Sequence, residues 1–299
     1  HKEYRRQRQM CIRDSLGTSG VWCRRRVSTA FTPATVGVIG LGRMAQALLF
    51  PLLASNRLPR ERVRAVVASQ ASAERLTAAH PGLAVGTDAT EAWRAEALLL
   101  AVKPQQLAAL AAAAPPPDPS APPSLLISVL AGVSLARLQT LFPGHRIVRA
   151  VPNTPCLVGA GLCGLAWGEG VSAPQRSWVQ QLFDQVGEVL ELPESQLDAF
   201  LALTSSGPAF VALVAEAMAD GAVAAGLPRA LAQHLAHRTL AGTAALLHQR
   251  DLHPGQLKDM VSSPGGTTIA GLRQLERGGA RSALMEAVLA AAERSRELA

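Results

Sequence analysis

The residues best suited to chemistry form a loop rich in glycine and hydroxyl groups at residues 262–268, Ser-Ser-Pro-Gly-Gly-Thr-Thr. The loop leads into a segment whose apolar residues, Ile269, Leu272 and Leu275, have the spacing of a helix. Free backbone N–H groups at a helix start, beside glycines and hydroxyls, suit an anion such as a carboxylate. An ordinary turn, with Thr267 or Thr268 capping the helix, explains the composition equally well.

A second candidate is the glycine loop at residues 40–45, Gly-Leu-Gly-Arg-Met-Ala. It follows the apolar run at 36–39 and opens a segment predicted to be helical over residues 43–54. In the G-x-G-x-x-G/A pattern, the first glycine allows a tight turn and the second lets the backbone approach a pyrophosphate. A purely structural glycine turn is the alternative, but the strand–turn–helix context favours a dinucleotide site.

The choice of dinucleotide depends on the residues that end the second strand. NAD-selective sites usually place a carboxylate there for the ribose hydroxyls. Residues 68–72 are Ala-Ser-Gln-Ala-Ser, without a carboxylate. Arg75 lies one helical turn later and Arg43 lies in the glycine loop, so a cation is expected within reach of a 2′-phosphate. The sequence therefore favours NADPH as the cofactor, with NADH also used.

Short apolar runs that alternate with helical segments must position these loops. Strands are predicted at 36–39, 63–68, 97–102, 125–129 and 146–150. Continuous apolar strands separated by helices are typical of an α/β, doubly wound parallel sheet. The alternation stops after residue 191, and helices are predicted from 197 to 298. We therefore divide the chain into residues 1–34, 35–193 and 194–299.

The helical part carries alanine and leucine on more than one face, for example at Leu231, Leu235 and Leu246. Helices that are apolar on several sides need burial on several sides. We therefore expect the helical part to form a subunit interface.

Basic residues are concentrated at the start of the chain. Residues 1–34 hold eight basic and two acidic side chains, which accounts for six of the formal net charge of +7. The rest of the chain is nearly neutral, so nucleic acid is not an expected partner. The basic segment is predicted to be a disordered extension without a folded role, or alternatively a mitochondrial transit peptide.

Membrane and metal sites are not expected either. We find no uninterrupted apolar run of about 18 residues, because Glu216 and Asp220 interrupt the longest candidate, 209–227. Cys156 and Cys163 have no metal-ligand spacing and are predicted to be buried, reduced thiols. No carboxylate-rich cluster surrounds the histidines.

Several motifs together resemble one family. The ordered set GVIGLGRMA, AVKP, LAGVSL, RAVPNTP, TSSGPAF, GLP and HPGQLKDMVSSPGGTTIAGL is similar to pyrroline-5-carboxylate reductase, over residues 36–298. The resemblance implies a Rossmann-type domain followed by an all-α dimerisation domain, with dimers assembling into a higher oligomer. It implies a cytoplasmic enzyme of proline biosynthesis that transfers a hydride from NADPH or NADH to the imine carbon of a cyclic imino acid.

The resemblance also assigns site residues by position. It places the following residues around the cofactor: Ile39, Gly40, Leu41, Gly42, Arg43, Met44, Ser69, Gln70, Asp88, Ala101, Val102, Lys103, Pro104, Ala131, Gly132 and Asn153. It places around the substrate Glu194, Ser263, Gly265, Gly266, Thr267 and Thr268. A protonated iminium needs no strong protein acid, so we expect the protein to act by positioning the substrate and by electrostatics. We expect the Thr268 hydroxyl to form a hydrogen bond with the ring nitrogen.

Three positions depart from the family pattern. Phe210 stands where a tyrosine is common, Ser205 where a glycine is common and Asp88 where an asparagine is common. A β-hydroxyacid dehydrogenase is the alternative enzyme, but neither Lys103 nor Lys258 follows a glycine-rich segment on a helix as that class requires. A catalytically silent dinucleotide-binding sensor is the alternative outside enzymes.

Overall fold

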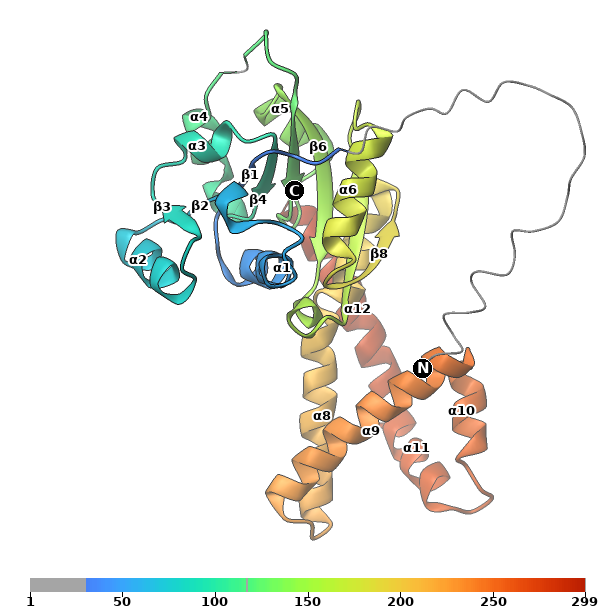
Figure 1. The fold of residues 1–299 in the computed structure, drawn as a ribbon. Helices are drawn as coiled ribbons and strands as arrows, with labels where there is room; N and C mark the ends of the chain where they lie inside the picture. The colour runs from blue at the N-terminus through green and yellow to red at the C-terminus, as the bar shows by residue number, and fades with distance from the viewer. Residues whose placement is uncertain (1–30, 117, 299) are drawn as a thin grey trace, which may run out of the picture. The chain divides into compact units, whose positions relative to one another are not determined.

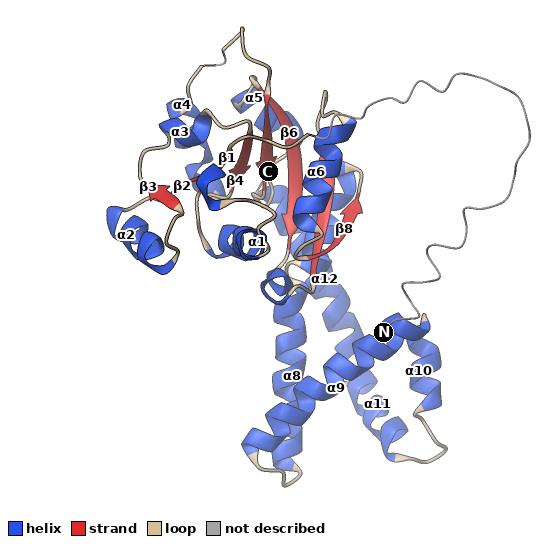
Figure 2. Ribbon diagram, viewed as in Figure 1, coloured by secondary structure: helices blue, strands red, loops and turns tan. Residues whose placement is uncertain are grey.

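The computed structural model describes residues 31–116 and 118–298, shown in Figures 1 and 2. This part of the chain holds one sheet of eight strands in the order β3-β2-β1-β4-β5-β6-β7-β8. The strands are β1 (Val36–Ile39), β2 (Val63–Val66), β3 (Ala84–Gly86), β4 (Ala97–Leu100), β5 (Ser124–Ser128), β6 (His145–Pro152), β7 (Gly161–Trp167) and β8 (Gly187–Glu191). The predicted basic segment falls outside the described residues except for 31–34, where the Phe31 ring packs edge-on against Trp178.

Helices cover both faces of the sheet, as its apolar strands require. They are α1 (Arg43–Ala54), α2 (Gln70–Ala79), α3 (Thr90–Trp93), α4 (Leu107–Ala113), α5 (Leu135–Leu141) and α6 (Ala173–Phe183), with short 3₁₀ turns η2 (Arg60–Arg62), η3 (Pro104–Gln106), η4 (Thr154–Val158) and η5 (Glu194–Gln196). Successive strand residues point to opposite faces. Leu99 packs into a core with α1 and α6, and Leu98 and Leu100 pack into a second core with α3, α4 and α5. The predicted doubly wound sheet is confirmed.

One pairing differs from the parallel pattern predicted for the sheet. Strand β7 runs antiparallel to β6, with Val148 opposite Trp167 and Pro152 opposite Cys163. Only the short η4 turn joins these two strands, and a parallel return would need a crossover of a dozen or more residues. Cys163 on β7 and Cys156 on η4 are free and buried, as predicted, and burial raises the pKa of both thiols.

Helices make up the rest of the described chain: α7 (Leu197–Thr204), α8 (Gly207–Ala224), α9 (Arg229–Arg250), α10 (Pro254–Met260), α11 (Thr267–Arg277) and α12 (Ala280–Glu297). Helices α8 and α9 pack through small residues, Ala219 against Ala232 and Ala236. Helix α12 packs along α7 and so returns to the sheet. The domain boundary predicted near Pro193 lies between β8 and α7 and stays a prediction.

Residues Glu194–Ala224, which include α7 and α8, have the length and mean hydropathy of a membrane span. The predicted absence of an uninterrupted apolar run of about 18 residues still holds, because Asp198 and Glu216 bound the longest stretch without a charged residue in this segment. A segment of this length and composition is weak evidence for a membrane. The segment is also interrupted between Thr204 and Gly207, where one helix ends and the next begins.

Gly37, in the first strand, allows helix α3 to pack closely on the sheet. We expect any larger residue at this position to lower the stability of the fold. A Cβ at Gly37 would lie 2.3 Å from the Ala92 carbonyl oxygen and 2.7 Å from Leu98 Cδ1. We predict that Gly37→Ala lowers the free energy of unfolding by about 2 kcal/mol or more, measured by urea denaturation.

The matched control is Gly86→Ala on the edge strand β3, where the nearest atom to an added Cβ, the Asp88 amide nitrogen, is 4.0 Å away. We expect this variant to unfold within about 0.5 kcal/mol of the wild type. Equal stability of the two variants would contradict the close contact.

Candidate functional site

The strand ends bring most of the predicted cofactor residues to one edge of the sheet. Ile39 pairs with Val66 on one side and with Leu100 on the other, and Leu100 pairs with Ser128. Parallel strands in register end together, so the loops after β1, β2, β4 and β5 share the carboxyl edge. This is the edge at which doubly wound sheets bind ligands.

The glycine loop is tightly packed on its inner side. Gly40 has φ of +92°, and a Cβ there would lie 2.7 Å from the Ala101 carbonyl oxygen. Its N–H donates to the Val66 carbonyl at 2.9 Å, and the Gln46 side chain donates to the Leu41 carbonyl at 2.9 Å. The loops after β1, β2 and β4 are therefore held together by backbone contacts.

The outer side of the same loop is open. Gly42 precedes the first residue of α1, and a Cβ there would have no heavy atom within 4 Å. No side chain caps α1, and its first turn contains no acidic residue. The helix start therefore offers backbone donors and a partial positive charge to an anion, which fits a dinucleotide pyrophosphate.

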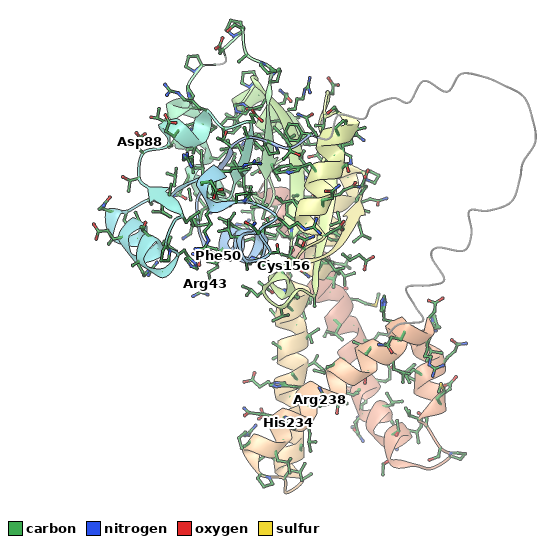
Figure 3. The ribbon with its side chains drawn as sticks, in the orientation of Figure 1. Arg43, Phe50, Asp88, Cys156, His234 and Arg238 are labelled. Carbon is green, nitrogen blue, oxygen red and sulfur yellow. The ribbon has the colours of Figure 1, made fainter. Side chains whose placement is uncertain are left out.

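Two arginines predicted to face a 2′-phosphate are Arg43, at the start of α1, and Arg75, within α2. Figure 3 shows Arg43 projecting from the beginning of α1. In the described part of the chain, neither Arg43 nor Arg75 forms an ion pair with a carboxylate. Both guanidinium groups therefore remain available for a phosphate.

The residues after β2 organise the next helix. Ser69 caps α2, and its hydroxyl accepts from the Ser72 N–H at 3.3 Å. Gln70, the first residue of α2, donates to Glu74 at 3.1 Å. No carboxylate follows β2 directly, as the sequence analysis noted.

The predicted residues after β4 and β5 also form turns at this edge. Lys103 precedes the 3₁₀ turn η3, which Pro104 begins, and its N–H donates to Gln106 at 3.2 Å. Gly132, after β5, has φ of +71°, a left-handed conformation that favours glycine. Ala131 and Val102 lie beside these turns in the sequence.

Asp88 and Asn153 already have partners within the chain. Asp88, labelled in Figure 3, accepts from the Thr90 hydroxyl at 2.7 Å and from the Thr90 N–H at 2.9 Å, which lowers the pKa of its carboxyl. The buried Asn153 donates to the Thr204 carbonyl at 2.9 Å and accepts from the Leu162 N–H at 2.8 Å. Contact of either side chain with a cofactor stays a prediction.

The second group of site residues lies between α10 and α11. Gly265 has φ of +66°, a left-handed conformation that favours glycine, and a Cβ on Gly266 would lie 3.1 Å from the Ser263 carbonyl oxygen, so the turn is tight. Gly266 is the N-cap of α11, and no side chain caps that helix. The prediction that Thr267 or Thr268 caps it was therefore wrong.

Because no side chain caps α11, the N–H groups at its start remain free to bind an anion. Thr267 and Thr268 are the first two residues of the helix, whose first turn contains no acidic residue. Their N–H groups precede the first intrahelical bond, from the Ala270 N–H to the Gly266 carbonyl at 3.3 Å. The Ser262 hydroxyl is buried without a hydrogen-bond partner among the described residues. These groups can receive a carboxylate.

Within the described part of one chain, the 262–268 loop and the loops at the sheet edge are not linked to each other. Among the described residues, no hydrogen bond or ion pair links 262–268 to the loops at the sheet edge. Glu194, predicted to lie near the substrate, instead accepts from the Leu135 N–H at 2.6 Å and from Arg149 at 3.2 Å. Its contact with a substrate stays a prediction.

Sequence reasoning missed a buried ionic cluster near the sheet edge. Arg149, only 3% exposed, contacts Glu194 and Asp198, and Asp198 accepts from the Ser295 hydroxyl at 2.8 Å. The available signal was a charged residue in the otherwise apolar end of strand β6. Its partners lie too far along the chain for sequence spacing to identify them.

Comparisons with known proteins cover both parts of the chain. The family described as pyrroline-5-carboxylate reductase dimerisation matches residues 194–298, and that described as NADP oxidoreductase coenzyme F420-dependent matches residues 35–132. Pyrroline-5-carboxylate reductase of Synechocystis sp. is 47% identical over 264 residues, covering 88% of this chain and 97% of that protein. The protein of the same name from Arabidopsis thaliana is 39% identical over 263 residues, covering 88% and 95%.

A solved structure has a similar fold. The crystal structure of Plasmodium falciparum pyrroline carboxylate reductase with NADP bound has a TM-score of 0.77 and 29% sequence identity. The match covers 89% of this chain and 98% of that one. The similarity therefore extends across both the sheet and the helices.

The open space around Gly42 allows its role in binding to be separated from a role in folding. We predict that Gly42→Ala binds NADPH at least about tenfold more weakly, because the added methyl group faces the approach of the pyrophosphate. Binding is measured by titration calorimetry. We expect the free energy of unfolding to change by less than about 0.5 kcal/mol.

Gly221→Ala, in α8, is the control, because an added Cβ there also has no atom within 4 Å. It should bind NADPH as the wild type does. Unchanged binding by Gly42→Ala would remove the glycine loop from the site.

Proposed function

The chain belongs to the pyrroline-5-carboxylate reductase family, and on this premise we propose that the glycine loop and the 262–268 loop are the two halves of its active site. It is an NAD(P)H-dependent oxidoreductase that reduces 1-pyrroline-5-carboxylate to L-proline, the last step of proline biosynthesis. The observation that carries this conclusion is the 47% identity over 264 residues.

The cofactor half comprises the loops at the carboxyl edge of the sheet. When bound, the nicotinamide supplies the hydride. Gly42 and the free N–H groups of the first turn of α1 hold the pyrophosphate, since nothing fills the space above them. Arg43 and Arg75 hold a 2′-phosphate, so NADPH is favoured, with NADH also used.

The substrate half is the start of α11. The N–H groups of Thr267 and Thr268 and the glycine-lined turn before them bind the substrate carboxylate. Holding the carboxylate fixes the ring, so the imine carbon faces the hydride donor. The substrate-domain boundaries, 194–299, are part of this proposal.

Thr268 has a separate role in this proposal. Thr268 is half-buried, and its hydroxyl accepts a hydrogen bond from the protonated ring nitrogen. That interaction favours the protonated iminium, whose carbon is electron-poor, so no strong protein acid is needed. The product amine is then held by the same hydroxyl until release.

We also propose that two copies of the chain pair through the helices α8 to α12. The core between α8 and α9 consists of alanines. Large apolar side chains on the same helices remain exposed, including Leu213 at 66%, Met260 at 68% and Met285 at 60%. So much exposed apolar surface on one set of helices indicates a protein interface. A dimer also allows a second copy to supply the 262–268 loop, and dimers assemble further.

The membrane-like hydropathy of α7 and α8 has the same explanation. The acidic residues of α7 and of the turn before it pair with Arg149, and the exposed apolar residues of α8 are those that a second copy would cover. A cytoplasmic location is part of the proposal. The mitochondrial alternative depends on residues 1–30, which lie outside the described part of the chain.

The activity is tested by following oxidation of NADPH and NADH with pyrroline-5-carboxylate, using the absorbance of the reduced nicotinamide. We expect saturable oxidation, proline as the product and a higher kcat/KM with NADPH. Tight NADPH binding without turnover would overturn the assignment.

The role of Thr268 makes a sharper prediction. We expect Thr268→Ala to lower kcat/KM at least about tenfold, because it removes a hydrogen bond to the reacting group. Thr268→Ser, which keeps the hydroxyl, should recover most of the loss. Thr140→Ala, on the exposed surface of α5, is the control and should leave kcat/KM unchanged. A loss of less than about twofold in Thr268→Ala would exclude the role.

The interface is tested by placing a charge on it. Leu213→Glu puts a carboxylate on the exposed apolar face of α8, and we predict that it converts the oligomer into monomers, measured by light scattering. Ala112→Glu, at an exposed position of α4, should leave the mass of the assembly unchanged. A monomeric wild type, or an oligomeric Leu213→Glu variant, would show that these helices do not form the interface.

A further inference from the structure

Arg149 joins three parts of the chain that are distant in sequence. It lies on β6 with its side chain 3% exposed. Its Nη1 lies 3.2 Å from Glu194 Oε1 and its Nη2 3.0 Å from Asp198 Oδ1. Glu194 is on η5 and Asp198 on α7, so the guanidinium fixes the start of the helical part against the sheet.

Each carboxylate uses the same oxygen for a second contact. Glu194 Oε1 accepts from the N–H of Leu135, the first residue of α5, at 2.6 Å. Asp198 Oδ1 accepts from the hydroxyl of Ser295, on α12, at 2.8 Å. Through its two carboxylates, Arg149 is therefore connected both to the loop that leads into α5 and to the last turns of α12.

These two ends meet at one point. A Cβ on Gly132 would lie 2.9 Å from the Ser295 carbonyl oxygen and 2.9 Å from Leu298 Cβ. The end of α12 thus lies directly against the backbone of Gly132, in the middle of residues 130–135, which we call the cofactor loop. The loop is held at Gly132 by contact with α12 and at Leu135 by the Glu194 carboxylate.

Stability alone is a weak explanation for this cluster. Buried ion pairs lose much of their Coulomb energy to desolvation, and apolar replacements are often as stable. The Arg149 Nε has no hydrogen-bond partner among the described residues, so the burial is incompletely compensated. A buried ionic cluster with a desolvation penalty, which connects three segments of the chain, is better explained as a device that holds those segments in fixed positions.

We propose that Arg149, Glu194, Asp198 and Ser295 are positioning residues that hold the cofactor loop at the distance from the sheet edge that the dinucleotide requires. The inference rests on the proposed function, in which Ala131 and Gly132 contact the cofactor. Glu194 acts here through the Leu135 N–H, not by touching the substrate.

The first test compares two substitutions of Glu194. Glu194→Ala removes the acceptor of the Leu135 N–H, and we expect the Kd for NADPH to rise roughly tenfold while the KM for pyrroline-5-carboxylate stays within about twofold. Glu194→Gln keeps an oxygen that can accept from that N–H and should restore the Kd to within about threefold of the wild type. A rise in the substrate KM with an unchanged NADPH Kd would overturn the proposal and favour substrate contact.

The second test asks whether the two arms act on the same loop. Ser295→Ala alone should raise the NADPH Kd about threefold, since it removes one neutral donor to a carboxylate. If both arms hold one loop, the double variant Glu194→Ala/Ser295→Ala should weaken binding by less than the product of the two single effects. Multiplicative effects would contradict a shared loop.

The control is Glu191→Ala, which removes a carboxylate bonded to Trp167 and Gln180 on the far strand β8. Its NADPH Kd should match the wild type. If the Glu194 and Ser295 variants had lower thermal stability but an unchanged Kd for NADPH, the cluster would stabilise the fold only, and the positioning role would be excluded. Failure of the wild type to bind NADPH or to reduce the substrate would instead overturn the proposed function itself.

Discussion

In-register pairing of the parallel strands β1, β2, β4 and β5 is the constraint on which the site depends. Only when Ile39, Val66, Leu100 and Ser128 end at one level do their following loops face the same ligand. The register is stabilised because alternate side chains enter two different cores, and a slip by one residue would exchange them. The close approach of Gly40 to Ala101 then places the glycine loop against its neighbour without a side chain between them.

The helical part follows a different principle. Its helices pack through alanines and leave their large side chains outside, so it resembles half of a core. A structure of this kind is stable when a second surface covers it. The proposed interface and the membrane-like hydropathy of α7 and α8 therefore follow from the same distribution of side chains.

The sequence predicted the elements with local signals. The helix at 43–54 has the predicted bounds, since a glycine loop precedes it, and the strand at 36–39 was equally clear. Strand β7 and its antiparallel pairing with β6 were not predicted, because its sequence, Gly-Leu-Cys-Gly-Leu-Ala-Trp, contains no β-branched residue. The cap of α11 was assigned to a threonine because hydroxyls favour that position, whereas the tight turn places Gly266 there.

The residues of the candidate site also differ in whether the local sequence predicts them. The two glycine-containing loops are each contiguous in the sequence, so their residue types alone were enough to propose both as parts of the site. The ionic cluster was not, because Arg149, Asp198 and Ser295 are brought together only by the tertiary fold. The contact between α12 and Gly132 has a consequence for biosynthesis. The ribosome completes the whole sheet long before it makes α12, so a nascent nucleotide domain lacks the support behind this loop. The contact at Gly132 can therefore form only after α12 has been made and has packed against the sheet.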